Sequence, residues 1–223
     1  MPDANTKTTE DTAPGAALYS NFFLSIYDFI VLGFNNPFAW KCHNSKLLNF
    51  YNRHVSGNHL DVGVGSGYYP DKCEFPVSQP RVVLMDLNPN SLAFTANRIQ
   101  RYKPTTYQVD ILQPVSLDIP GFDSISLYYL LHCLPGTMKS KTAAFAHLKT
   151  LLNEGGVLFG STILGQGRPF NFLGQMLMKG NNASGGFSNT QDNLADLEQG
   201  LGRHFSEYET EMVGHVAFFV GRK

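Results

Sequence analysis

The sequence is poor in the features that define several classes of protein. Its 223 residues include three cysteines, which form no CxxC pair and no spacing with histidine that is typical of a metal site. So few cysteines, in an odd number, argue against a disulfide framework and favour a reducing compartment. The formal net charge is −1, which gives no electrostatic reason to expect binding to nucleic acid or to an anionic membrane surface.

Long hydrophobic runs and a secretory signal are also missing. The longest apolar stretch, residues 21–34, contains Asp28 and is too short to span a bilayer. Residues 1–16 are polar, and we expect them to be a disordered leader. The apolar residues of 18–32 recur at helical spacing, so residues 17–56 are expected to form a helical cap. We therefore expect a cytoplasmic protein without a membrane or nucleic-acid partner.

The middle of the chain alternates between strand and helix patterns. Strands are predicted at residues 60–63, 82–86, 106–109, 124–128 and 157–162, with helices at 90–102 and 138–152 between them. The strands are continuous apolar runs, as expected when helices cover both faces of a parallel sheet. Further on, a helix at 192–201 precedes strands at 205–211 and 213–220, whose short link favours an antiparallel hairpin. These patterns predict one α/β domain over residues 17–223, with a doubly wound sheet.

A glycine- and asparagine-rich segment, residues 165–190, interrupts this pattern. It also carries apolar side chains, among them Phe170, Phe172, Met176, Met178 and Phe187. One interpretation is a surface insertion with a short helix. The other is a mobile lid whose aromatic and methionine side chains shape an adaptable pocket.

The most informative segment follows the first predicted strand, where three glycines alternate with other residues. Gly63, Gly65 and Gly67 allow a tight turn and a close approach of a ligand to the backbone. A dinucleotide-binding loop would have its third glycine at position 68, which is Tyr68. Asp61 just before the loop suits a cationic group better than a pyrophosphate. These details disfavour a nicotinamide oxidoreductase and point to S-adenosylmethionine, whose amino acid end carries an ammonium group.

Later strand ends supply the remaining cofactor contacts. Asp86 ends the second strand, where a carboxylate can accept hydrogen bonds from ribose hydroxyls, and Leu87 follows it. Asp110 ends the third strand beside Ile111, a pair that suits the amino group and the apolar face of adenine. Tyr128 closes the fourth strand at the same edge. The predicted cofactor residues are therefore Asp61, Gly63, Gly65, Gly67, Tyr68, Asp86, Leu87, Asp110, Ile111 and Tyr128.

The order HLDVGVGSG, VVLMDLNP, YQVDIL and LLNEGGVLF resembles the class I S-adenosylmethionine-dependent methyltransferases. The segments YDFIVLGFNNPFAWKC and YYLLHCLPGTM resemble more closely the short O-methyltransferases of polyketide pathways, which act on small enolic rings such as hydroxy-α-pyrones. The resemblance implies a Rossmann-like sheet of seven strands with a C-terminal antiparallel hairpin. It also implies O-methylation of an enol or phenol hydroxyl on a small molecule.

Two histidines are candidates for a catalytic base toward that acceptor. His132 follows the fourth strand at the edge where ligands bind in open α/β sheets, and its ordinary pKa suits a base near neutrality. His43 competes with it, because the N-terminal segment could fold over the pocket. The alternatives are a methyltransferase-like cyclase or binding protein without methyl transfer, and an N- or C-methyltransferase. No metal site is predicted, and the oligomeric state is not readable.

Overall fold

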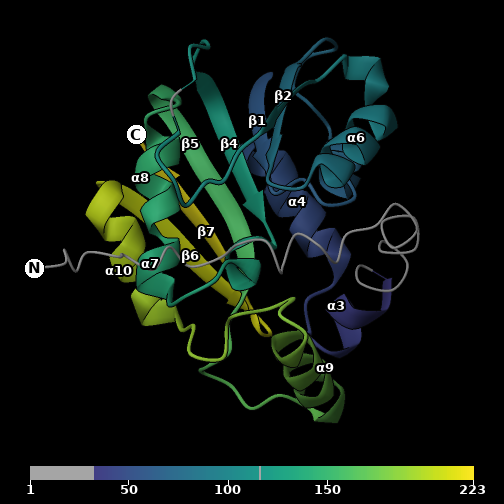
Figure 1. Ribbon diagram of the computed structural model, residues 1–223, viewed down its shortest axis with the longest axis vertical. Helices are drawn as coiled ribbons and strands as arrows, with labels where there is room; N and C mark the ends of the chain where they lie inside the picture. The colour runs from purple at the N-terminus through teal and green to yellow at the C-terminus, as the bar shows by residue number, and fades with distance from the viewer. Residues whose placement is uncertain (1–32, 116) are drawn as a thin grey trace, which may run out of the picture.

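Seven strands form one mixed sheet in the computed structural model, which describes residues 33–115 and 117–223 (Figure 1). The predicted leader and the predicted helix at 18–32 lie outside these residues. The strands are β1 (Asn58–Val62), β2 (Arg81–Asp86), β3 (Thr105–Gln108), β4 (Phe122–Tyr128), β5 (Leu152–Ile163), β6 (Glu207–Val213) and β7 (Val216–Arg222).

The order of the strands across the sheet is β3-β2-β1-β4-β5-β7-β6. Strands β1 to β5 pair in parallel, whereas β7 runs antiparallel to both β5 and β6. The chain moves outward from β1 to β3 and then returns to place β4 on the other side of β1. This reversal leaves a crevice at the carboxyl ends of β1 and β4, where ligands bind in open α/β sheets. The predicted seven-stranded sheet and its C-terminal hairpin are confirmed.

Helices cover both faces of the sheet (Figure 1). On one face, α4 and α6 pack through apolar residues such as Phe50 and Leu92. On the other face, α8 and α10 pack through Phe145 and Leu197. The helices are α3 (Asn36–Phe38), α4 (Asn44–His54), α5 (Tyr68–Lys72), α6 (Pro89–Arg98), α7 (Met138–Lys141), α8 (Ala143–Lys149), α9 (Phe172–Ala183) and α10 (Leu194–His204), with 3-10 turns η2 (Gln100–Tyr102) and η3 (Leu131–Cys133).

The helix predicted at 138–152 is wrong in its extent. It is divided at Thr142 into α7 and α8, and Leu152 already belongs to β5. Gly155 and Gly156, a pair that by its sequence alone is typical of a helix end, lie inside β5, where Gly155 has a left-handed φ of 75°. The ladder between β4 and β5 shifts its register at the same place. A local irregularity of the strand, rather than a helix end, is what these glycines permit.

Residues 165–190 contain α9 and are tied to the sheet by side chains. Phe170, Met178 and Phe187 pack on a cluster that includes Trp40, whereas Phe172 is 83 % exposed. Asparagine side chains anchor both ends of the segment. Asn171 caps α9 and donates to the Phe38 carbonyl at 2.7 Å, and Asn189 donates to the Ile163 carbonyl at 2.9 Å. A lid role stays a prediction.

Strand β6 is the outer strand of the hairpin and forms one edge of the sheet. Three of its side chains, Glu207, Glu209 and Glu211, alternate along the strand and are exposed. In the part of the chain that the structure describes, no helix combines the length and apolar character needed to cross a membrane.

Candidate active site

A cleft opens at the carboxyl edge of the sheet where β1, β2 and β4 end. Nine of the ten residues predicted to bind the cofactor line it, namely Asp61, Gly63, Gly65, Tyr68, Asp86, Leu87, Asp110, Ile111 and Tyr128. They come from three consecutive βα connections and from the end of β4. The topology brings them together because the carboxyl ends of parallel strands meet at one edge.

The glycine loop between β1 and α5 has a left-handed backbone at each of its three glycines, with φ between 51° and 70°. At Gly65 an added Cβ would meet no atom within 4 Å, so the space above this glycine is open to a ligand. Gly67 does not line the cleft. It precedes α5, and an added Cβ would lie 2.6 Å from Cγ2 of Thr95, whose hydroxyl donates to the Gly65 carbonyl at 3.1 Å. Gly67 therefore lets the loop pack against α6.

Asp61 supplies a carboxylate at the base of the cleft. Its side chain is buried, and the Ser126 hydroxyl donates to Oδ1 at 2.7 Å. Burial raises the pKa of Asp61 to about 7, and the nearby charge of Asp86 acts in the same direction. A carboxylate in this setting gains much from a cationic ligand, since the charge would compensate its loss of hydration.

A buried polar network supports Asp61 from behind. Ser126 Oγ lies 3.2 Å from Nε2 of His59, and the same nitrogen lies 2.8 Å from the Tyr51 hydroxyl. The other ring nitrogen of His59 lies 2.8 Å from Ser124 Oγ. Burial lowers the pKa of His59 to about 3, so the imidazole is neutral. This network fixes Ser126, which in turn holds the Asp61 carboxylate.

Two further carboxylates occupy the ends of β2 and β3. Asp86 accepts the backbone N–H of Asn88 at 2.8 Å, and burial raises the pKa of Asp86 to about 6. Asp110 accepts the backbone N–H of Leu112 at 3.0 Å. Both carboxylates are thus oriented by backbone donors next to the cleft.

The sequence analysis did not select the part of the wall that follows β4, nor several lining residues of the first three βα connections. Tyr129, Leu130, Cys133, Leu134 and Pro135 line this side, which is mostly apolar. Tyr129 has a left-handed φ of 53°, and its hydroxyl donates to the side chain of buried Asn36 at 3.1 Å. The only signal in the sequence was their position after the fourth strand.

Neither predicted catalytic histidine is among the residues that line the cleft. His132 lies in η3, is 3 % exposed and packs its ring against Phe187, with ring centroids 4.5 Å apart. His43 is exposed and caps α4, where its Nδ1 accepts the backbone N–H of Ser45 at 3.3 Å. His43 thus has a structural task at the start of a helix.

The doubly wound sheet, the glycine loop and the carboxylates at successive strand ends define a nucleoside-cofactor-binding α/β enzyme. A family model described as a methyltransferase domain matches residues 60–158. The chain is 40% identical over 205 residues to demethylluteothin O-methyltransferase of Streptomyces thioluteus, covering 92% of this chain and 89% of the relative. It belongs to this methyltransferase family and is an S-adenosylmethionine-dependent methyltransferase that acts on a small molecule.

Other relatives share almost the full length of the chain. The physcion biosynthesis cluster O-methyltransferase of Aspergillus chevalieri is 36% identical over 214 residues, covering 95% of this chain and 96% of the relative. The N-methyltransferase vrtF of Penicillium aethiopicum is 39% identical over 222 residues, covering 96% of this chain and 92% of the relative. Among solved structures, the N-methyltransferase NodS of Bradyrhizobium japonicum WM9, in complex with S-adenosylhomocysteine, has the same fold. Its TM-score is 0.63 at 18% identity, covering 94% of this chain and 98% of NodS.

The residues present fit S-adenosylmethionine. The open space above Gly65 admits a ligand against the backbone, and the raised pKa values of Asp61 and Asp86 mark carboxylates that a ligand would stabilise. Asp61 would hold the cationic amino acid end and Asp86 the ribose hydroxyls. Asp110 and Ile111 would face the adenine.

Proposed function

We propose that this methyltransferase acts on a hydroxyl oxygen of a small enol or phenol in polyketide-type secondary metabolism. The observation that carries the proposal is the likeness over nearly the full chain to relatives named for O-methylation. The acceptor would bind on the β4 side of the cleft, where Tyr129, Leu130 and Leu134 provide an apolar wall. Such a wall suits a small planar molecule.

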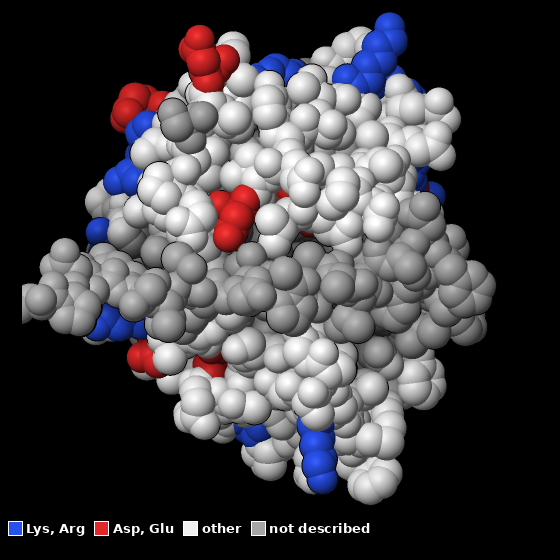
Figure 2. All heavy atoms as spheres, viewed as in Figure 1, with Lys and Arg blue, Asp and Glu red and all other residues white. Residues whose placement is uncertain are grey.

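The surface charge agrees with a small acceptor. On the face in Figure 2, basic and acidic side chains of the described residues are scattered, and most of that surface carries neither. A partner such as nucleic acid would favour a continuous basic area. Apolar side chains of residues 165–190, such as Phe170 and Phe187, pack near Trp40. These side chains would shield the acceptor site as part of a lid.

The protein's own contribution is binding, orientation and exclusion of water. When bound, the cofactor supplies a methyl group on a positively charged sulfur. The carboxylate of Asp61 would hold one end of the cofactor and that of Asp86 its middle. The apolar β4 wall would hold the acceptor against them, in a site from which water is displaced.

N-methylation is the second candidate, because one relative of nearly equal similarity is named an N-methyltransferase. C-methylation, and cofactor binding without transfer as in a cyclase or a binding protein, are further alternatives. Incubating the protein with labelled S-adenosylmethionine and a panel of enols, phenols, amines and activated carbon acids distinguishes them. We expect release of S-adenosylhomocysteine and an O-methyl product. A labelled N-methyl product, or tight cofactor binding with no transfer, would contradict the proposal.

We also propose that the enzyme works in the cytoplasm. Burial raises the pKa of both Cys42 and Cys73 to about 12, so neither thiol is reactive. Free thiols of this kind are compatible with a reducing compartment. Microscopy of the tagged protein in its host would test this.

A further inference from the structure

The cleft carries negative charge that no basic side chain of its wall balances. Three of the residues that line it are aspartates, namely Asp61, Asp86 and Asp110. None of the described residues along this wall is lysine, arginine or histidine. A ligand with positive charge therefore suits the site. The methylated cofactor carries one positive charge more than the demethylated product, because methyl transfer leaves a neutral sulfur.

Two tyrosines lie in the same wall as Asp61. Tyr69, from α5, and Tyr128, at the end of β4, both line the cleft and are called the tyrosine pair below. Their ring centroids lie 4.6 Å apart, with an angle of 47° between the ring planes. Burial, together with the nearby charge of Asp61, raises the pKa of the Tyr128 hydroxyl well above its usual value. The ring of Tyr128 is therefore that of a neutral phenol near neutral pH.

The hydroxyl groups of the tyrosine pair are bonded to α4. The Tyr69 hydroxyl donates to Oδ1 of Asn44 at 3.1 Å, and the Tyr128 hydroxyl donates to the Leu47 carbonyl at 3.2 Å. Each hydroxyl thus gives its proton to a group of the protein. The part of these side chains that is left to meet a ligand in the cleft is the aromatic ring.

Further aromatic side chains hold the tyrosine pair from behind. Tyr51 stacks on Tyr69, with ring centroids 5.8 Å apart, and meets Tyr128 edge to face at 5.1 Å. Phe159 also meets Tyr128 edge to face, at 5.9 Å. Tyr51 and Phe159 are fully buried, whereas Tyr69 and Tyr128 are 8 % and 6 % exposed. The tyrosine pair is therefore shielded from water, the setting in which an aromatic ring attracts a cation most strongly.

Tyr68, the neighbouring residue of the cleft wall, is already engaged by a cation of the protein. The guanidinium carbon of Arg98 lies 5.7 Å from the centre of the Tyr68 ring. Arg98 also donates to the Ser66 carbonyl in the glycine loop at 3.0 Å. This contact leaves the tyrosine pair as the aromatic surface next to Asp61 that a cationic ligand would meet.

We propose that the tyrosine pair binds the positively charged sulfur of S-adenosylmethionine through its aromatic rings, so that the site prefers the methylated cofactor to S-adenosylhomocysteine. An aromatic ring attracts a cation that lies within about 6 Å of its centre. The neutral sulfur of the product gains no such attraction. The contacts of Asp61 with the ammonium group and of Asp86 with the ribose are shared by both forms of the cofactor. The tyrosine pair would thus favour exchange of the spent cofactor, whichever atom of the acceptor receives the methyl group.

Calorimetry with the two forms of the cofactor tests this proposal without any acceptor. The measured quantity is the Kd of S-adenosylhomocysteine divided by the Kd of S-adenosylmethionine. Tyr69→Leu and Tyr128→Leu should each lower this ratio about 3–30-fold, the range expected when one contact between a cation and a ring is lost. Tyr69→Phe and Tyr128→Phe keep the ring, so their ratios should stay within about threefold of the wild type.

The control for these variants is Tyr208→Leu, since Tyr208 lies on β6 and is 43 % exposed. It should change neither Kd. Equal losses of affinity for both forms of the cofactor in the leucine variants would overturn the proposal. Such a result would mean that the rings support the wall or contact the ammonium group, which both forms carry.

A second measurement covers leucine variants that fail to fold. Phenylalanine with one, two or three ring fluorines, incorporated at position 69 or 128, keeps the shape of the ring while each fluorine withdraws negative charge from its face. We expect the affinity for S-adenosylmethionine to fall with each added fluorine and that for S-adenosylhomocysteine to stay constant. A series in which both affinities stay constant, or fall in parallel, would contradict the proposal. Because no acceptor is present, either outcome leaves the proposed O-methylation untouched.

Discussion

Asp61→Asn should make the free protein more stable near neutral pH while it weakens cofactor binding. In the folded protein the pKa of Asp61 is raised to about 7 by burial, and in the unfolded chain it returns to its ordinary value. Between these two values the folded state binds a proton that the unfolded state does not. The contribution of the Asp61 carboxyl to the free energy of unfolding is therefore largest below about pH 4. This contribution decreases as the pH rises and is lost by about pH 7. Asparagine has no such proton to lose.

The size of this effect follows from the two pKa values of Asp61. A difference between 3.8 and about 7 corresponds to about 4 kcal/mol at roughly 1.4 kcal/mol for each pH unit. Between about pH 5 and pH 7.5, about 2–3 kcal/mol of it is lost. Burial raises the pKa of Asp86 in both proteins, so the comparison reports Asp61 together with its charge interaction with Asp86. The Ser126 hydroxyl can still donate to the amide oxygen of asparagine.

The assay is urea unfolding of both proteins without cofactor at these two pH values. We expect the stability of Asp61→Asn relative to the wild type to improve by about 2–3 kcal/mol from the lower to the higher pH. In a domain of this size that corresponds to a change in Tm of about 5–10 °C. The control is Asp118→Asn, since this aspartate is exposed, and its relative stability should be the same at both pH values.

A stability difference between Asp61→Asn and the wild type that does not depend on pH would refute the reasoning. It would mean that Asp61 is hydrated or paired with a cation in the free protein. A second consequence concerns binding itself. A cationic cofactor should lower the pKa of Asp61, so that binding near pH 6.5 releases a proton. Calorimetry in buffers of different ionisation enthalpy measures this release, and in Asp61→Asn the release should be smaller.

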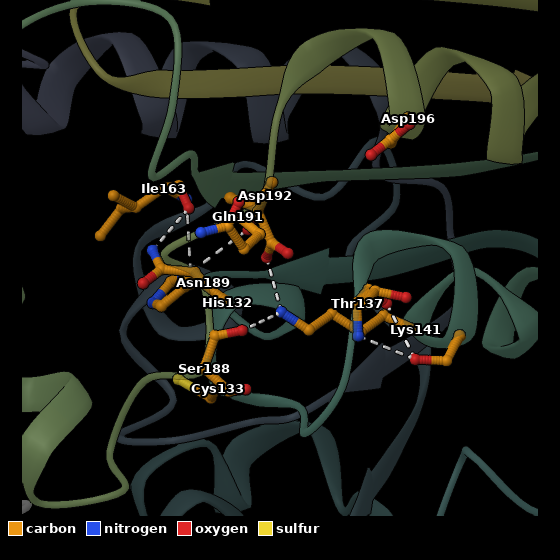
Figure 3. A network of polar contacts seen from close by, with 12 residues as sticks. His132, Cys133, Thr137, Lys141, Ile163, Ser188, Asn189, Gln191, Asp192 and Asp196 are labelled. Atoms are coloured by element: carbon orange, nitrogen blue, oxygen red, sulfur yellow. Dashed lines mark hydrogen bonds and ion pairs between the residues drawn. The ribbon is translucent and has the colours of Figure 1, made fainter.

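The other predictions concern the glycine loop and the buried ion pair between Lys141 and Asp192 (Figure 3). Gly67→Ala should destabilise the fold by about 2–4 kcal/mol, since alanine would have a left-handed φ and would crowd Thr95. Gly65→Ala should cost only about 1–2 kcal/mol of stability but weaken cofactor binding, because its methyl group would occupy the open space of the cleft; equal stability losses in the two variants would contradict this. Lys141→Met should cost about 3–5 kcal/mol, because it leaves the buried Asp192 carboxylate without its cation. Adding Asp192→Leu should restore at least half of that loss in urea unfolding, and no recovery would show that other contacts dominate.

The cofactor side of the cleft was largely predictable from the sequence. Asp61, Asp86 and Asp110 each end or precede the end of an apolar run, and parallel strands bring their carboxyl ends to one edge. Acids at the ends of successive strands can therefore be predicted to lie close together in the folded protein. Gly67 is the exception: whether a glycine faces a ligand or packs against a helix depends on Thr95, which lies in another element.

The acceptor side was less predictable because its properties depend on contacts between distant parts of the chain. The position of His132 after β4 follows from the strand pattern. Its hydrogen bond, however, comes from the backbone N–H of Ile163, and its burial depends on the 165–190 segment with Lys141 and Asp192. The same limit explains β5. Gly155-Gly156 reads locally as a helix stop, and only pairing with β4 shows it to be part of a strand.

The glutamates of β6 have a consequence for how two molecules can meet. The unpaired backbone groups of an edge strand are a template on which a strand of another chain can add. A second copy that approached β6 edge to edge would bring its own Glu207, Glu209 and Glu211 close to those already there. Repulsion between the two rows of carboxylates would oppose continuous sheets across molecules, most strongly at low ionic strength. This edge therefore protects the sheet against aggregation at neutral pH, and acidification would weaken that protection.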